Sequence, residues 1–179
     1  LTATQPRPAQ AADVLANALL ALRQLLRLCD ARHRQNLLWC LGAHEVVFEL
    51  VRTMADVEQA DGGQGVRMPP EQVRAVREAA FELMGHFAEG NARNQRAVFE
   101  HFALVLAHMS TVRRATTCAR VVLKGHAANC AAVTDAHLAQ LIGLMSGGSA
   151  RYAWYLDVLL ELTRGLDRGN AAVPLSILR

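Results

Sequence analysis

The stretch "GNARNQRAVFEHFALVLAHM" (90–109) decides the fold, because it joins a Gly-Asn turn signal and a cluster of amides and arginines to a long apolar run. An earlier stretch, "ARHRQNLLWCLGAHEVVFELV" (31–51), has much the same layout. Each cluster leads into apolar side chains at helical spacing. The repetition predicts similar helical units, and the arginines raise the question of a bound anion.

Helical spacing continues along the rest of the chain, with apolar residues at i, i+3, i+4 and i+7. Gly42 suits a left-handed helix end, Pro69 and Pro70 suit a helix start, and Thr134 and Ser149 suit N-caps. The pattern predicts helices at about 10–29, 32–41, 43–58, 71–90, 92–100, 101–109, 112–124, 126–132, 135–146 and 150–165, and the start of another within 169–178.

Composition points to one all-α domain. The chain has 179 residues, of which 52% are hydrophobic and only 5% aromatic, with few β-branched residues outside short Val pairs. This length suits a single domain with a sizeable core. We expect residues 1–9 to form a flexible N-terminal segment and 10–179 a single helical domain, with a mobile loop at 59–69, where turn formers replace the periodicity.

The charge pattern does not favour nucleic acid as a partner. The net charge is only +3, and all but one of the 19 basic residues are Arg, the exception being Lys124. These arginines are spread along the chain, and no base-stacking aromatics interleave with them. An Arg-rich, Lys-poor composition is also typical of a GC-biased genome.

The four cysteines are not arranged as CxxC, which favours free thiols in a reducing compartment. No apolar window reaches the roughly 20 residues of a membrane span, so we expect no membrane contact by this fragment. Because the chain starts at Leu1 without a methionine, we expect it to be part of something larger.

The amides recur at an interval that suggests repeats. Asn36, Asn94, Asn129 and Asn170 are spaced by intervals averaging close to the roughly 40–47 residues of armadillo and HEAT units. The chain is therefore expected to form an armadillo-like α-solenoid of short helices, each unit burying its apolar stripe against the next. At a helix start, such amides would hydrogen-bond orphan backbone groups of the neighbouring turn.

That role does not explain the arginines. Arg32 and Arg34 stand in the first turn of their helix, where the macrodipole favours acidic residues. Arginine side chains together with free backbone N–H groups could form a phosphate cradle. The alternative is a salt bridge to a residue such as Asp30, Glu45 or Glu89.

Catalysis has no candidate residues. Neither a Ser-His-Asp nor a Cys-His constellation has a recognisable spacing, and "GGQG" (62–65) lacks the strand and lysine of a phosphate loop. His101 and His108 are two helical turns apart, about 10 Å, which is too far for one metal ion. We expect no enzyme activity, no cofactor and no metal.

Three segments together resemble a known family. They are "RHRQNLLWCLGAHEVVFELV" (32–51), "FELMGHFAEGNARNQRAVFEHFALVLAHM" (81–109) and "GHAANCAAVTDAHLAQLIGLMSGGSARYAWYLDVLLELTRGLDRGNAAVPLSIL" (125–178). Their order, from about Val14 to the end, resembles the homology domain shared by inositol trisphosphate receptors and ryanodine receptors.

The resemblance implies a non-catalytic helical module on the cytosolic side of a homotetrameric calcium-release channel in an endoplasmic-reticulum-type membrane. Its partners would be neighbouring domains of the same subunit, including an upstream β-trefoil, and it would relay conformational change between them. In the inositol trisphosphate receptors the first copy of this domain forms half of the ligand site. Arg32, Arg34 and Arg93 match basic positions of that half-site.

Other ligand positions of the family are changed here. Asn36 and Trp39 occupy two further basic positions, and Asn91 and Ala92 replace a Tyr-Arg pair. Losing several charge-assisted contacts, each about 1.5 to 3 kcal/mol, should abolish inositol phosphate binding at physiological concentration. The site is thus either a degenerate half-site or a purely architectural module, as in ryanodine receptors. The alternative function is a free-standing armadillo-type scaffold that binds a peptide.

Overall fold

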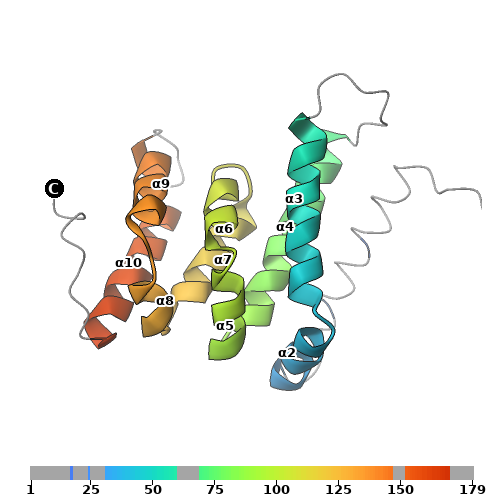
Figure 1. Cartoon of the computed structure of the whole chain (residues 1–179). Helices are drawn as coiled ribbons and strands as arrows, with labels where there is room; N and C mark the ends of the chain where they lie inside the picture. The colour runs from blue at the N-terminus through green and yellow to red at the C-terminus, as the bar shows by residue number, and fades with distance from the viewer. Residues whose placement is uncertain (1–16, 18–23, 25–30, 60–68, 147–151, 170–179) are drawn as a thin grey trace, which may run out of the picture. The chain divides into compact units, whose positions relative to one another are not determined.

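A computed structural model describes residues 17, 24, 31–59, 69–146 and 152–169 of the chain. All regular structure in these residues is α-helical, which confirms the predicted all-α class. The described residues form the helices labelled in Figure 1: α2 (Ala31–Cys40), α3 (Ala43–Gln59), α4 (Pro70–Ala88), α5 (Ala92–Phe99), α6 (Phe102–His108), α7 (Arg113–Leu123), α8 (Ala127–Ala131), α9 (Asp135–Ser146) and α10 (Tyr152–Gly169).

The helix ends follow the local sequence signals. α2 ends before Gly42, whose φ of 62° is the left-handed conformation that glycine adopts without steric cost. Pro70 is the first residue of α4, where its missing N–H leaves no bond unmade. At the start of α9 the Thr134 hydroxyl accepts from the His137 N–H at 3.3 Å, and the His137 ring accepts from the Thr134 N–H at 3.3 Å. Thr134 therefore caps α9 as predicted.

Several expectations fall on residues that the structure does not describe. These are the flexible segment 1–9, the loop at 59–69 apart from its two end residues, the Ser149 cap and the segment 170–178. Of the helix expected at 10–29, only Asn17 and Gln24 are described, and both are helical and exposed.

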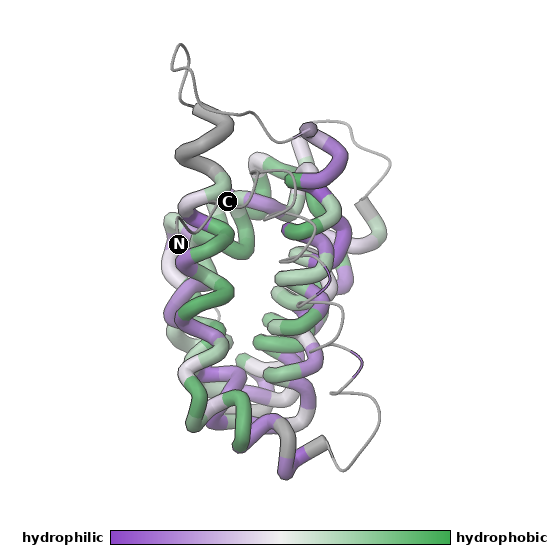
Figure 2. Tube along the Cα trace, turned by 90° about the vertical axis from the view of Figure 1, so that its right-hand side faces the viewer, coloured by the Kyte–Doolittle hydropathy of each residue, from purple (hydrophilic) through white to green (hydrophobic). Residues whose placement is uncertain are grey.

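The chain divides into two compact units, Leu1–Leu83 and Met84–Arg179, with the boundary inside α4. In the first unit, α2 packs against α3. Phe48, Val51 and Met54 form the buried stripe of α3, and Val76 and Phe81 belong to that of α4. Figure 2 shows how apolar and polar residues alternate along the helices. The expectation of a single domain over 10–179 stays a prediction.

The second unit consists of the end of α4 and two groups of three helices. In the first group α7 packs against α5 and α6, and in the second α10 packs against α8 and α9. The groups join through α7, which packs against both α8 and α10. Figure 1 shows α6 above α5 and α9 above α8, with α7 and α10 behind them.

Two contacts fix α10 in this unit. A side-chain Cβ at Gly165 would lie only 2.9 Å from the Cβ of Cys130, so α10 approaches α8 at a distance that only glycine permits. Tyr155, which is fully buried, donates its hydroxyl to the backbone oxygen of Met109 at 3.5 Å. α10 is thereby tied both to α8 and to the end of α6.

Candidate functional site

The second unit contains two helix corners built alike. At the first, Gly90 has a φ of 67°, and the Asn91 side chain caps α5 by accepting from the N–H of Asn94. At the second, Gly125 has a φ of 69°, and the His126 ring caps α8 by accepting from the N–H of Asn129. The two corners are 35 residues apart in the sequence and share the order of glycine, capping side chain and asparagine.

A buried amide closes each corner. The Asn94 side-chain amide donates to the backbone oxygen of Phe87 at 2.8 Å. That of Asn129 donates to the backbone oxygen of Val122 at 3.0 Å. Both acceptors lie in the last turn of the preceding helix, where carbonyl groups lack partners within the helix. This is the role that the sequence predicted for these two amides.

The two corners are also bonded to each other. The Gln95 side chain donates to the backbone oxygens of Val121 at 2.7 Å and Lys124 at 3.0 Å. In return, the Asn129 amide donates to the backbone oxygen of Gln95 at 3.2 Å. Because the His126 Nδ1 accepts from Asn129, its Nε2 carries the proton and donates to the backbone oxygen of Ala92 at 3.0 Å. The corners therefore form one polar network.

In the first unit the expected amide role is wrong for Asn36. This side chain is exposed in the middle of α2, whereas its neighbour Gln35 is buried. Gln35 and Asn36 are one helical step of about 100° apart, so Gln35 points inward and Asn36 points toward solvent. Asn170, the fourth member of the proposed series, lies outside the described residues.

The predicted ligand arginines lie on two helices in different units. Arg32 is exposed in the first turn of α2, where no acidic residue is present. Arg34 lies on the same helix, but its side chain is outside the described part of the structure. Arg93 is exposed in the first turn of α5, two residues after its cap Asn91. All three belong to the first turn of a helix, where an anion would be favoured.

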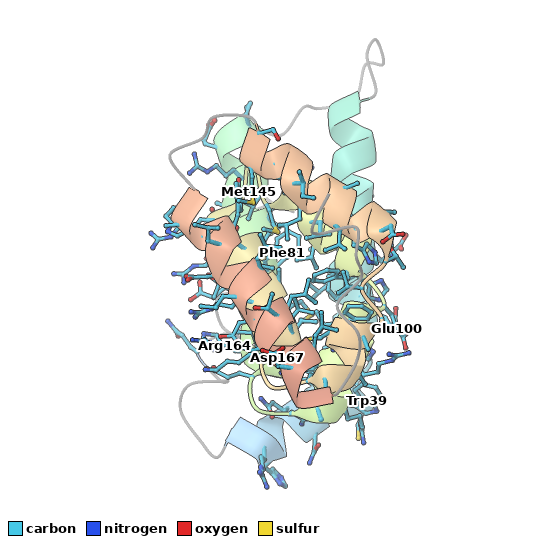
Figure 3. The ribbon with its side chains drawn as sticks, turned by 90° about the vertical axis from the view of Figure 1, so that its left-hand side faces the viewer. Trp39, Phe81, Glu100, Met145, Arg164 and Asp167 are labelled. Carbon is cyan, nitrogen blue, oxygen red and sulfur yellow. The ribbon has the colours of Figure 1, made fainter. Side chains whose placement is uncertain are left out.

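Sequence reasoning missed a groove between α7 and α10. Its first part, about 230 Å³, is lined by Arg113, Thr116, Thr117, Arg120, Trp154 and Asp157. Its second part, about 440 Å³, shares Arg120 and is lined further by Glu89, Gly90, Gln95, Val121, Lys124, Gly125, Glu161 and Arg164. Arg164 lies on the flank of α10, as Figure 3 shows. The signal available in the sequence was the spacing of Arg113 and Arg120, which puts both on one face of a helix.

Buried cysteines in the second unit offer no nucleophile. Burial raises the pKa of the Cys118 thiol to about 12. For Cys130, burial and then the nearby charge of Glu161 raise the pKa to about 11. Because the reactive form of a cysteine is the thiolate, both side chains stay protonated and inert at neutral pH. Among the described residues, no group of three or more His, Cys, Asp or Glu side chains is placed to hold a metal ion.

Comparison with known proteins places the chain in a family. The family model described as the RIH domain, of ryanodine and inositol trisphosphate receptors, matches residues 17–171. The chain belongs to the RIH domain family. No curated protein and no solved structure matches it. The match covers both corners and the groove of the second unit, and it confirms the resemblance drawn from the three sequence segments.

Membership of the RIH family associates the chain with receptor channels of the ryanodine and inositol trisphosphate type. In the helices that the structure describes, none has the length and apolarity to cross a membrane. The match spans α2 and α5, the helices that carry Arg32, Arg34 and Arg93, and leaves the role of these arginines as a prediction.

Proposed function

We propose that this RIH domain is a non-catalytic helical-repeat module of an intracellular ligand-gated calcium-release channel, where it relays conformational change between neighbouring domains. The match of the family model over residues 17–171 carries this proposal. The channel would be a homotetramer in an endoplasmic-reticulum-type membrane, with the module on the cytosolic face and an upstream β-trefoil as one neighbour.

The repeat geometry supports the relay. The corners at Gly90 and Gly125 each have a left-handed glycine, a capping side chain and a buried asparagine amide, which is the pattern expected of an armadillo-like α-solenoid. Stacked helices of this kind move by small shear displacements. The bonds from Gln95 to the second corner would make one repeat follow the other.

Calcium release tests the channel role. The full-length parent would be placed in vesicles loaded with calcium, and efflux would be followed with an indicator dye. We expect the wild-type parent to release calcium on ligand addition and a Gln95→Ala parent to release less at equal abundance, because two of the four hydrogen bonds that join its corners are lost. A parent chain without any membrane span would end the proposal.

We propose inositol phosphate binding at most as the activity of a degenerate half-site, with Arg32, Arg34 and Arg93 as its anchors. Calorimetry at low salt compares the chain with a variant carrying Arg32→Ala and Arg93→Ala. Binding that the variant loses would support the half-site. Null titrations for both proteins would leave an architectural module.

A second candidate function is a free-standing armadillo-type scaffold that binds a peptide. The groove between α7 and α10 favours it, because a helix-lined groove is the binding surface that such repeats use. A parent chain that lacks membrane spans and retains the groove would favour this function over the channel.

A further inference from the structure

The α7–α10 groove has a basic wall. From His101 to Thr134 the chain contains no Asp or Glu, although four basic residues, Arg113, Arg114, Arg120 and Lys124, lie within this stretch. Three of these four line the groove on α7. Their spacing of seven and four residues puts them on one face of the helix, over about 16 Å of its axis. The α7 wall therefore presents a line of positive charge.

Two of these cations are not neutralised within the described part of the chain. Arg120 and Lys124 are exposed, and neither forms an ion pair there. Arg113 instead lies over the ring of Trp154, with its guanidinium carbon 4.7 Å from the ring centroid. The opposite wall differs, since its Glu161 is 3.4 Å from Arg164 and the two largely offset each other. Asp157 and Glu89 also line the groove, so its four basic side chains stand against three acidic ones, and the surplus positive charge is on α7.

The shape of the groove suits a chain and not a compact ligand. Arg120 lines both parts, which together follow α7 from Arg113 to its end. A peptide in an extended conformation advances about 3.3 Å per residue, and about five residues would span the distance from Arg113 to Lys124. Such a peptide needs partners for its backbone N–H and C=O groups. The Asp157 carboxylate and the Thr117 hydroxyl supply an acceptor and a donor at the first part of the groove.

We propose that the α7–α10 groove binds an acidic peptide segment in an extended conformation, with Arg120 and Lys124 pairing its carboxylates and the Arg113–Trp154 stack forming one end of the site. The ligand class follows from the surplus of positive charge on α7 and from the length of the groove. The proposal does not depend on the channel role, because the groove lies within the second unit and binding needs no membrane.

Fluorescence anisotropy with the full 179-residue chain tests this proposal. The probe is a fluorescein-labelled octapeptide that alternates glutamate with serine, and the control probe has glutamine in place of glutamate. We expect saturable binding of the glutamate peptide only, and weaker binding at high salt because exposed charges are screened. Equal binding of both peptides, or of neither, would overturn the proposal.

A matched pair of variants locates the site. Arg120→Gln removes the charge shared by both parts of the groove, whereas Arg96→Gln removes an exposed charge on α5 outside it. We expect Arg120→Gln to weaken peptide binding by about threefold to tenfold, as for a partly exposed charge pair, and Arg96→Gln to leave it unchanged. Equal losses in the two variants would mean non-specific attraction and would contradict the assignment. Thermal melting of both variants verifies that they are folded.

Two further readouts separate the peptide from other ligands. In a Trp39→Phe background the remaining described indole is Trp154, so its emission should change as the glutamate peptide saturates the groove. Binding without any change in this emission would place the peptide elsewhere. Inorganic phosphate and inositol hexakisphosphate are titrated as competitors. If either binds in an Arg120-dependent manner while the peptide does not, the groove takes small anions and the peptide proposal is wrong.

Discussion

Asn94 and Asn129 occupy equivalent positions, because both are fully buried and each donates its side-chain amide to the carbonyl of the residue seven positions earlier. The acceptors, Phe87 and Val122, belong to the last turns of α4 and α7. A helix end that enters the core leaves carbonyl groups without partners, and the amide that follows the turn supplies one. Each corner is therefore held by an asparagine that lies only a few residues after the helix end to which it bonds.

Replacing either amide should destabilise the second unit. Asn94→Ala or Asn129→Ala leaves a buried carbonyl unpaired, and we expect a loss of about 2 kcal/mol in the free energy of unfolding, with the greater loss for Asn129, which donates two bonds. Urea denaturation followed by circular dichroism measures it. The control is Gln140→Ala, a partly exposed amide of α9, which should change the value by less than about 0.5 kcal/mol. Losses of equal size in all three variants would contradict the special role of the corners.

Gly165 should not tolerate a methyl group. Gly165→Ala places its Cβ against the Cys130 side chain, and we expect a destabilisation of about 1 to 3 kcal/mol from overpacking between α10 and α8. Gly143→Ala is the matched control, because Gly143 is an exposed helical glycine with no atom near its Cβ position. That variant should gain up to about 1 kcal/mol from helix propensity. Thermal melting compares the two variants. A gain in stability for both would show that α10 can move away from α8 without cost.

Thr116 carries a buried hydroxyl that the fold does not use. In the described part of the chain its Oγ1 has no hydrogen-bond partner, although the side chain is only 5% exposed. Thr116→Val removes this unpaired group, and we expect a gain of about 1 kcal/mol in the free energy of unfolding. Thr117→Val, at the exposed neighbouring position, should have little effect. If Thr116→Val instead destabilises the protein, the hydroxyl has a partner in solution.

His137 should make stability depend on pH. Burial lowers the pKa of this ring below its ordinary value of about 6.5, so the folded state binds its proton less readily than the unfolded state. The contribution of His137 to the free energy of unfolding is fully present above the pKa of the ring in the unfolded state. It is lost as the pH falls through the pKa of the ring in the folded state. We expect stability to decline below about pH 6.5.

The His137→Gln variant is the control for this pH dependence. Its stability should decline less steeply than that of the wild type between neutral and mildly acidic pH, because the variant lacks the His137 ring and keeps the other histidines. Urea midpoints measured across this pH range give the comparison. Parallel curves for the two proteins would show that the His137 ring has the same pKa in the folded and the unfolded state.

Alkylation should distinguish the described cysteines. With iodoacetamide near pH 8, Cys40 should react in the folded protein because its side chain is exposed. Cys118 and Cys130 should react only on unfolding, because both are buried and their raised pKa values keep them protonated. Peptide mapping by mass spectrometry reports each site. Native labelling of Cys118 at the rate of Cys40 would contradict the buried arrangement.

Much of the fold could be predicted because its signals are local. Helix ends at Gly42 and Thr134 and the start at Pro70 depend on one or two residues, and the structure confirms them within two positions. The apolar stripes repeat every three to four residues and so identify each helix. The amide series was harder to predict, because a single helical step decides whether Gln35 or Asn36 faces inward.

By itself, the sequence determined the helices, their ends, the two amide corners and the family. These features depend on short-range patterns and on the order of motifs, which a linear chain displays directly. Only the tertiary structure decided that Gln95 bonds to the next corner, that Gly165 lies against Cys130, and that α7 and α10 enclose a groove. Those relations join residues more than 25 positions apart, and their geometry follows from how the helices pack.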